Sequence, residues 1–396
     1  MKKKITVGTS LVLMLFAILL TFQITYSFVG DEYQKKVETL AKDRSDFSLL
    51  VYADDVIREN FFQNVDEDRL DEGLLTGYIA SLGDPYSRYM TAEEYDRYQK
   101  EQSATGNGIG VRLIRDDATK AVLIYSLYPD SPAEKAGLRK GDELYRIGEQ
   151  AVSEMDLYDV ATLLSGKAGS SVSVTVKREM ATQVLEMEFS ITREELVASD
   201  VSYEMLSDTV GYVQIFAMTQ NTPKELSEAL KVLDRKGAGS LIFDVRGNRG
   251  ENLDASLEML DMLLPQGTIA HLTDRSGTVT KVKSDSKGVL LPMAVLINSS
   301  TASAAELFAA SLRDCCGAVL VGETSYGKGV DQAVFELDDG SALLLSNRSF
   351  QPPKSASFED VGVSPDQAVP FDAKKLYLVS HEEDAQLVKA LEILSE

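Results

Sequence analysis

The pattern of apolar and polar residues first changes near residue 31, where an uncharged stretch gives way to an acidic one. Within residues 31–100, apolar residues recur at three- and four-residue intervals, as they do from Leu70 to Leu82, and this period is typical of amphipathic helices. Gly83-Asp84-Pro85 predicts the end of that helix, because proline disfavours helical backbone in the preceding residue and glycine frees the turn. Residues 104–178 instead show short alternating segments, which predict β strands with one helix near 156–165.

From about residue 200 onward, predicted strands and helices alternate. Apolar runs of strand length are separated by amphipathic segments of helical length, and Asp338-Asp339-Gly340 is a hairpin signal. This alternation predicts an α/β domain with a largely parallel sheet. The predicted strands are Val210–Phe216, Leu241–Val245, Met293–Ile297, Ala318–Val321, Val330–Leu337 and Ser341–Ser346, and the predicted helices are Thr222–Lys236, 252–264, Ala304–Asp314 and Ala385–Leu394.

Residues 5–30 form an uncharged run that follows three N-terminal lysines. The run is long enough to span a bilayer core of about 30 Å as a helix. Because the basic cluster comes first, the N-terminus is predicted to stay in the cytoplasm and the rest of the chain to lie outside. A cleaved signal peptide and a buried core helix are the alternatives, but Ile24–Ser27 lacks a clean small-residue cleavage site and a core helix would not explain the lysines. An uncleaved anchor that meets the membrane through residues 5–29 is therefore the favoured prediction.

Charge and composition exclude several kinds of site. The formal net charge is −22, and residues 1–30 contribute +3, which leaves −25 for the remainder. An acidic chain without a basic stripe is not expected to bind nucleic acid. The two histidines, His271 and His381, cannot form a multi-histidine metal centre, so neither a metal nor a cofactor is expected. Cys315 and Cys316 are adjacent and are interpreted as small helix residues, because a disulfide between neighbours is strained.

Two glycine-containing segments interrupt the β-rich region, Gly106–Val111 and Ser131–Asp142. Successive N–H groups freed by glycines can bind a carboxylate, and an adjoining strand edge can pair with an extended peptide. A nucleotide-binding loop is disfavoured because β-type sequence follows where a helix is needed, and a plain glycine-rich hairpin stays an alternative. Both segments resemble those of PDZ domains. That resemblance implies a peptide-binding loop made of Gly108, Ile109, Gly110 and Val111.

Thr301–Glu306 lies between a predicted strand and a predicted helix. Ser303 could present its hydroxyl at the helix N-terminus, where N–H groups and the helix dipole favour developing negative charge. Taken alone, however, Ser303-x-x-Glu306 more often indicates a capping box. A nucleophile and a cap are both kept as interpretations of Ser303.

Lys328 lies in Gly327-Lys328-Gly329. A phosphate-binding loop is rejected, because Gly329 replaces the required Ser or Thr and a strand follows where a helix is needed. A solvated loop lysine is the ordinary interpretation. A buried lysine with a lowered pKa can nevertheless serve as the base for a serine nucleophile. Neither histidine is well placed for that task.

Asp244–Gly250 follows an apolar strand and contains two glycines. A loop of this kind beside the serine could direct backbone N–H groups at an oxyanion. A simple strand-to-helix turn is the alternative.

Together these segments resemble the C-terminal processing peptidases, also called tail-specific proteases, a family of serine peptidases with a PDZ domain. The resemblance covers nearly all of the chain beyond residue 50 and includes a glutamine four residues after the lysine. It implies Ser303 as nucleophile, Lys328 as base, Gln332 as the residue that orients the base, and Gly250 and Ala304 as oxyanion donors. Thr301, Ala305 and Glu251 depart from the family pattern, as does one extra residue after Thr324. The matching segments are Leu82–Ser87, Asp244–Gly250, Thr301–Glu306, Gly322–Gly329, Gln332 and Gly362–Asp366.

The resulting prediction is an α/β multidomain protein. Its predicted parts are a membrane anchor (1–30), an N-terminal helical region (31–103), a PDZ domain (104–192) and an α/β serine-peptidase core with a C-terminal helix (193–396). The resemblance implies an endopeptidase that captures unfolded or tail-exposing protein substrates by their C-terminal tails. The expected location is the cell membrane, single-pass, with the catalytic portion on the extracytoplasmic side. Residues 31–80 fit either a homodimer contact or a solvated helical arm.

Two non-enzymatic functions compete with this prediction. One is a membrane-anchored PDZ scaffold that has lost catalysis, and the other is a chaperone-like holder of unfolded chains. Intact Ser303, Lys328 and Gln332 argue against the scaffold.

Overall fold

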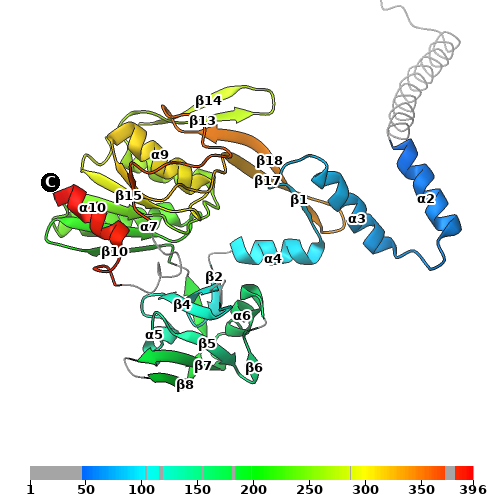
Figure 1. Cartoon of the computed structure of the whole chain (residues 1–396), viewed down its shortest axis with the longest axis horizontal. Coiled ribbons are helices and arrows are strands. Elements are labelled where there is room, and N and C mark those ends of the chain that lie inside the picture. The colour runs from blue at the N-terminus through cyan, green and yellow to red at the C-terminus, as the bar shows by residue number, and fades with distance from the viewer. Residues whose placement is uncertain are drawn as a thin grey trace, which may run out of the picture. The chain divides into compact units, whose positions relative to one another are not determined.

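The computed structural model (Figure 1) describes residues 47–102, 105–115, 119–153, 155–180, 183–197, 199–285, 287–370 and 380–395. The predicted membrane anchor lies outside these residues. Within them, no helix is both long enough and apolar enough to cross a membrane. The chain divides after Leu75 into two compact units, which are described separately.

The first unit holds helix α2 (Ser48–Asn60) and the first part of α3 (Glu67–Ala80). Every residue of α2 is partly or fully exposed, including apolar Leu49 and Tyr52. Arg58 near the end of α2 forms ion pairs with Asp54 and with Glu67 of α3, so a charged contact ties the two helices together. The helical prediction for 31–103 is confirmed for α2 and α3, but Arg88–Met90 forms a strand and residues 31–46 lie outside the described residues. The homodimer stays a prediction.

The β-rich region forms its own sheet in the second unit, in the order β3-β4-β5-β7-β8, with β6 beside β5. Its core is made by alternate strand residues and by the two short helices. Among the described strands, β3 pairs only with β4 and therefore forms an edge of this sheet beside α6. β2 precedes this sheet in the chain and β9 follows it. The two strands pair with each other as a separate antiparallel ribbon. The elements are β2 (Thr105–Gly108), β3 (Val111–Arg115), β4 (Val122–Leu127), α5 (Pro132–Ala136), β5 (Glu143–Ile147), β6 (Gln150–Ala151), α6 (Leu157–Leu164), β7 (Ser171–Met180), β8 (Gln183–Thr192) and β9 (Glu194–Val197).

The remaining core contains a six-stranded sheet in the order β10-β11-β12-β15-β16-β19. Strands β11 to β19 of this order run parallel, and β10 is antiparallel at the edge. One face packs on α7, α8 and α9, and the other on α10, so the sheet is buried between two layers of helix (Figure 1). The predicted parallel sheet is confirmed. The elements are β10 (Val201–Met205), β11 (Val210–Ile215), α7 (Thr222–Arg235), β12 (Ser240–Asp244), α8 (Leu253–Leu263), β15 (Met293–Ile297), α9 (Ala304–Cys316), β16 (Val319–Gly322), β19 (Gln367–Ala368) and α10 (Ala385–Ser395).

A second, antiparallel sheet in the core was only partly predicted. The predicted hairpin of β17 and β18 is confirmed, but β18 is longer than expected and also pairs with β1 and β13. The sequence of β14 is largely polar and its residues are largely exposed, so no apolar pattern indicated it. The elements are β1 (Arg88–Met90), β13 (Gly267–Asp274), β14 (Val279–Ser284), β17 (Val330–Glu336) and β18 (Ala342–Gln351), with α4 (Ala92–Gln102) after β1.

Candidate active site

Ser303 occupies a sharp turn between β15 and α9. Its backbone has φ 54° and ψ −122°, a region that a residue with a Cβ rarely adopts. Such strain persists only where the surroundings impose it, and it is common at functional sites. Ala304 is the first helical residue, so its N–H has no partner within the helix. A serine hydroxyl and a helix N-terminus therefore meet at one point.

The carboxylate of Glu306 connects this turn to the lysine loop. Oε2 accepts hydrogen bonds from the backbone N–H groups of Ser303 (2.8 Å) and Lys328 (2.9 Å). Oε1 accepts from Ser325 Oγ (2.5 Å) and from the Gly327 N–H (2.7 Å). Burial raises the pKa of Glu306 above its ordinary range, and these four hydrogen bonds oppose that effect. The carboxylate side of the predicted capping box is thus confirmed, and the same carboxylate also holds a second loop.

Lys328 directs its amine at a glutamine. Lys328 Nζ donates to Gln332 Oε1 at 2.7 Å, and Gln332 Nε2 donates to the carbonyl oxygen of Tyr86 at 2.7 Å. The second bond orients the glutamine amide, because only its oxygen can accept from the lysine. The Tyr86 ring lies 5.0 Å from Lys328 Nζ. Burial lowers the pKa of Lys328, while Asp331, Asp84, Glu359 and Glu251 oppose that shift through their charges.

A cavity of about 390 Å³ is lined by the predicted nucleophile, the predicted base and Gln332. Gly250 also lines it, so the structure brings residues from three predicted site segments, the Gly250 loop, the serine turn and the lysine loop, to one cavity. Arg249 and Glu251 lie beside Gly250. The other charged and aromatic lining residues are Tyr86, Arg88, Tyr98 and Asp331.

Gly250 approaches the serine turn very closely. Its φ is +63°, and a Cβ at this position would lie 2.4 Å from the backbone nitrogen of Ala304, so only glycine fits. The Gly250 N–H donates to Asn248 Oδ1 at 2.8 Å. It must exchange this partner before it can stabilise an oxyanion, and its role as a donor stays a prediction, as does that of Ala304. Glu251 Oε2 accepts from the Met218 N–H (3.0 Å), which anchors the next residue of the loop.

Comparisons with known proteins match all three parts of the chain. Residues 209–369 match the model for Peptidase family S41, residues 123–178 match a PDZ domain, and residues 13–94 match the N-terminal domain of the activating protease CtpB. A carboxyl-terminal-processing protease from Picosynechococcus sp. is 30% identical over 80% of this chain and 77% of its own length. The chain belongs to the C-terminal processing proteases of family S41. It is therefore a serine-type C-terminal processing peptidase.

Other members of the family agree with this assignment. The carboxy-terminal processing protease CtpA of Bacillus subtilis is 34% identical over 76% of this chain, which spans 64% of that protein's length. The solved photosystem II D1 C-terminal processing protease is 28% identical, with a TM-score of 0.51 over 78% of this chain and 84% of its own. A crystal structure of an S41 protease from Bacteroides fragilis gives a TM-score of 0.61 at 21% identity, over 87% and 97% of the two chains, which supports the fold. The predicted domain boundaries stay predictions, because the matched segments begin and end at other residues.

In this C-terminal processing peptidase, the predicted PDZ loop does not line the catalytic cavity. Gly108 ends β2, Val111 begins β3, and Ile109 is buried with its carbonyl oxygen accepting from the Ala133 N–H. Gly110 has φ +80°, and a Cβ there would lie 2.4 Å from the Cβ of Ser131. The loop thus leads directly into the β3 edge. Its contact with a peptide stays a prediction.

Several residues around the site were not predicted from the sequence. Thr301 was noted only as a departure from the family pattern, yet its hydroxyl donates to the Val245 carbonyl (2.9 Å) and accepts from the Asn298 N–H (3.0 Å). Tyr86 lies in a segment that was matched but given no role. The contacts of Thr301 with Val245 and of Tyr86 with Gln332 join residues 56 and 246 positions apart, and no local pattern reports such pairs.

Proposed function

We propose that this peptidase is an extracytoplasmic endopeptidase that cleaves protein substrates recognised through their C-terminal tails, by a Ser–Lys mechanism. The observation that carries this proposal is the shared Glu306 oxygen, which accepts from the N–H groups of both Ser303 and Lys328. One buried atom thereby holds the nucleophile's backbone and the base's backbone together.

The proposed mechanism uses the side chains in the order that their chemistry requires. Neutral Lys328 removes the proton from Ser303 Oγ as the oxygen attacks the peptide carbonyl carbon, and it then donates that proton to the leaving amine. Gln332 keeps the amine oriented through its bond to Nζ. The Ala304 N–H, and the Gly250 N–H once released from Asn248, would stabilise the oxyanion. Each such donor contributes about 3–4 kcal/mol in known cases.

The PDZ domain supplies the proposed recognition of the tail. Among the described strands the outer edge of β3 is unpaired, and α6 lies beside it, so an extended peptide can add to the sheet there. A terminal carboxylate would then face the Gly108–Gly110 backbone, whose N–H groups could bind it. The tail would serve to deliver an unfolded substrate to the peptidase core.

A cleavage assay with matched tails tests the proposed function. The full chain is incubated with an unfolded protein that ends in an apolar tail, and with the same protein whose terminal carboxyl is amidated. We expect cleavage of the free tail to be at least about 10-fold faster, because one lost charge-assisted contact is worth roughly 1.5–3 kcal/mol. Ser303→Ala should cleave neither substrate, as measured by gel and mass spectrometry.

The same assay separates the alternatives. A wild-type rate no greater than that of Ser303→Ala would favour the PDZ scaffold over the peptidase. Tight binding of unfolded protein without cleavage would favour the chaperone-like holder. Equal rates on the two tails would overturn tail recognition while leaving the peptidase intact.

The proposed location rests on charge and hydropathy. Lys2, Lys3 and Lys4 precede the uncharged run of residues 5–30, and the rest of the chain is strongly acidic. We expect the protein to stay in the membrane pellet after carbonate extraction, with its C-terminal portion digested by protease added to intact spheroplasts. Release by carbonate, or protection of the C-terminal portion, would contradict the proposed topology.

A further inference from the structure

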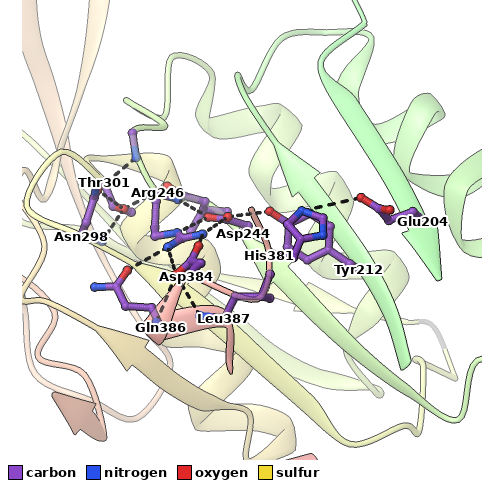
Figure 2. Close-up of polar contacts among 12 residues, drawn as sticks. Glu204, Tyr212, Asp244, Arg246, Asn298, Thr301, His381, Asp384, Gln386 and Leu387 are labelled. Carbon is purple, nitrogen blue, oxygen red and sulfur yellow. Dashed lines mark hydrogen bonds and ion pairs between the residues drawn. The ribbon is translucent and has the colours of Figure 1, made fainter. Parts of the chain in front are cut away.

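Arg246 is buried at the end of the core sheet and its guanidinium is fully bonded (Figure 2). Asp244, at the end of β12, accepts from Nε (2.9 Å) and from one terminal nitrogen (2.6 Å). Asp384 accepts from both terminal nitrogens (3.1 and 2.7 Å), and Gln386 Oε1 accepts from one of them (2.9 Å). Asp384 and Gln386 belong to the start of α10, 138 and 140 residues away in the sequence.

Asp384 has two tasks in this cluster. Its Oδ1 also accepts from the N–H groups of Gln386 and Leu387, so it caps α10. Its Oδ2 bonds to Arg246. Tyr212 of β11 donates a hydrogen bond from its hydroxyl to Asp244 Oδ2 (2.7 Å). Lys140 of the PDZ domain interacts electrostatically with Asp244, Arg246 and Asp384.

Stability alone does not explain such a cluster. Removing charged groups from water is costly, and well-packed apolar residues of similar volume usually stabilise a protein at least as well as a buried ion pair. A guanidinium held in two bidentate pairs does, however, have one orientation. The cluster therefore fixes the direction in which the chain leaves β12.

The chain that leaves β12 is the loop that reaches the serine turn. The Val245 carbonyl accepts from the Thr301 hydroxyl (2.9 Å), and the Gly247 N–H donates to Asn298 Oδ1 (3.0 Å). The Asn248 carbonyl accepts from the Ala302 N–H (2.9 Å). Every residue pair in this series joins the Arg246 loop to the loop that ends at Ser303.

We infer that Asp384, with Gln386, is a positioning residue for catalysis: through Arg246, the start of the C-terminal helix sets the loop Asp244–Gly250 against the serine turn. This inference rests on the proposed function and adds α10 to the parts on which the oxyanion site depends. A substitution at Asp384 would therefore affect catalysis by displacing the Gly250 backbone.

Asp384→Asn tests the inference, because asparagine still caps α10 but offers Arg246 one acceptor fewer. We expect kcat for a chromogenic peptide to fall about 10-fold with KM changed less than twofold, the mark of an interaction needed in the transition state. Affinity for a peptide aldehyde, whose adduct with Ser303 places an oxygen at the oxyanion position, should fall by the same factor. Affinity for the matching unreactive peptide alcohol should not change.

Leu387→Ala is the matched control, because Leu387 packs α10 on the sheet through an apolar side chain that can accept no hydrogen bond from Arg246. It should lower the unfolding temperature but keep kcat. An unchanged kcat in Asp384→Asn, or an equal loss of kcat in both variants, would overturn the inference while leaving the peptidase activity established.

Hydrogen exchange provides a second test, which does not depend on turnover. In the Ser303→Ala background, Asp384→Asn should speed amide exchange in Asp244–Gly250, and Leu387→Ala should not. Unchanged exchange in this loop would overturn the inference even if the wild-type chain cleaved nothing.

Discussion

Replacing Lys328 with alanine should lower kcat for peptide cleavage by at least about 10⁴-fold, the scale seen when a serine peptidase loses its base. Alanine cannot accept the Ser303 proton, and the two described histidines are not among the residues that line the cavity. KM should change little, because the amine acts in the transition state. Steady-state kinetics beside Lys231→Ala, an exposed lysine of α7, separate this loss from a general effect of removing a lysine.

The pH profile identifies the base independently of mutation. Burial lowers the pKa of Lys328 below its ordinary value of 10.5, against the opposing charges of nearby carboxylates. Below the folded-state pKa the amine is protonated and cannot accept a proton, so kcat/KM should rise with pH and level off above that pKa. In Gln332→Leu the rise should move to lower pH and the plateau should fall, because the acceptor that stabilised the ammonium and aimed the amine is lost.

A histidine-governed profile would contradict this assignment. If activity followed a group near the ordinary histidine value of about 6.5 and vanished in His271→Ala, Lys328 would not be the base. The structure places His271 within β13 of the antiparallel sheet.

The local part of this architecture could be predicted from the sequence. Apolar runs such as Met293–Ile297 match the observed strand at both ends, because a fully buried parallel strand is apolar throughout. The helix after Ser303 begins where the turn signal places it. The serine turn and the loop Asp244–Gly250 both lie where a strand ends, and the change in hydrophobic periodicity shows where that end is.

The remainder depends on contacts that no local pattern encodes. Ser303-x-x-Glu306 indicated a cap, but three of the four donors to Glu306 come from the lysine loop. The spacing of residues did not predict which side chains contact Lys328. It also did not predict the bidentate pair of Arg246 and Asp384, which lie 138 residues apart in the sequence. The reacting residues could be predicted from the resemblance to a family, whereas the residues that position them could be identified only from the fold.

Glu306→Leu should be the most disruptive substitution outside the reacting groups. Leucine has a similar volume but accepts nothing, so four buried donors lose their partner at about 1–3 kcal/mol each. We expect the free energy of unfolding to fall by about 4 kcal/mol or more, measured by urea titration. We also expect kcat on the folded fraction to fall about 10²-fold, the scale of a 1 Å misplacement of catalytic groups. Glu228→Gln, on the exposed side of α7, is a neutral control.

Glu306→Gln assigns the effect to one oxygen and remains informative if the leucine variant does not fold. The amide can keep its oxygen at the Oε2 position, bonded to Ser303 and Lys328, and turn its NH₂ toward Ser325 Oγ, which can accept. The Gly327 N–H and the Ser325 O–H then lose their acceptor, so the free energy of unfolding should fall by about 1–3 kcal/mol for each of them while kcat stays within a few-fold. Ser325→Ala removes one Oε1 donor and the acceptor of the Val363 N–H but leaves both bonds to Oε2, so it should behave alike. If either variant lost as much activity as Glu306→Leu, the link between nucleophile and base would not run through Oε2, and Glu306 would serve the fold alone.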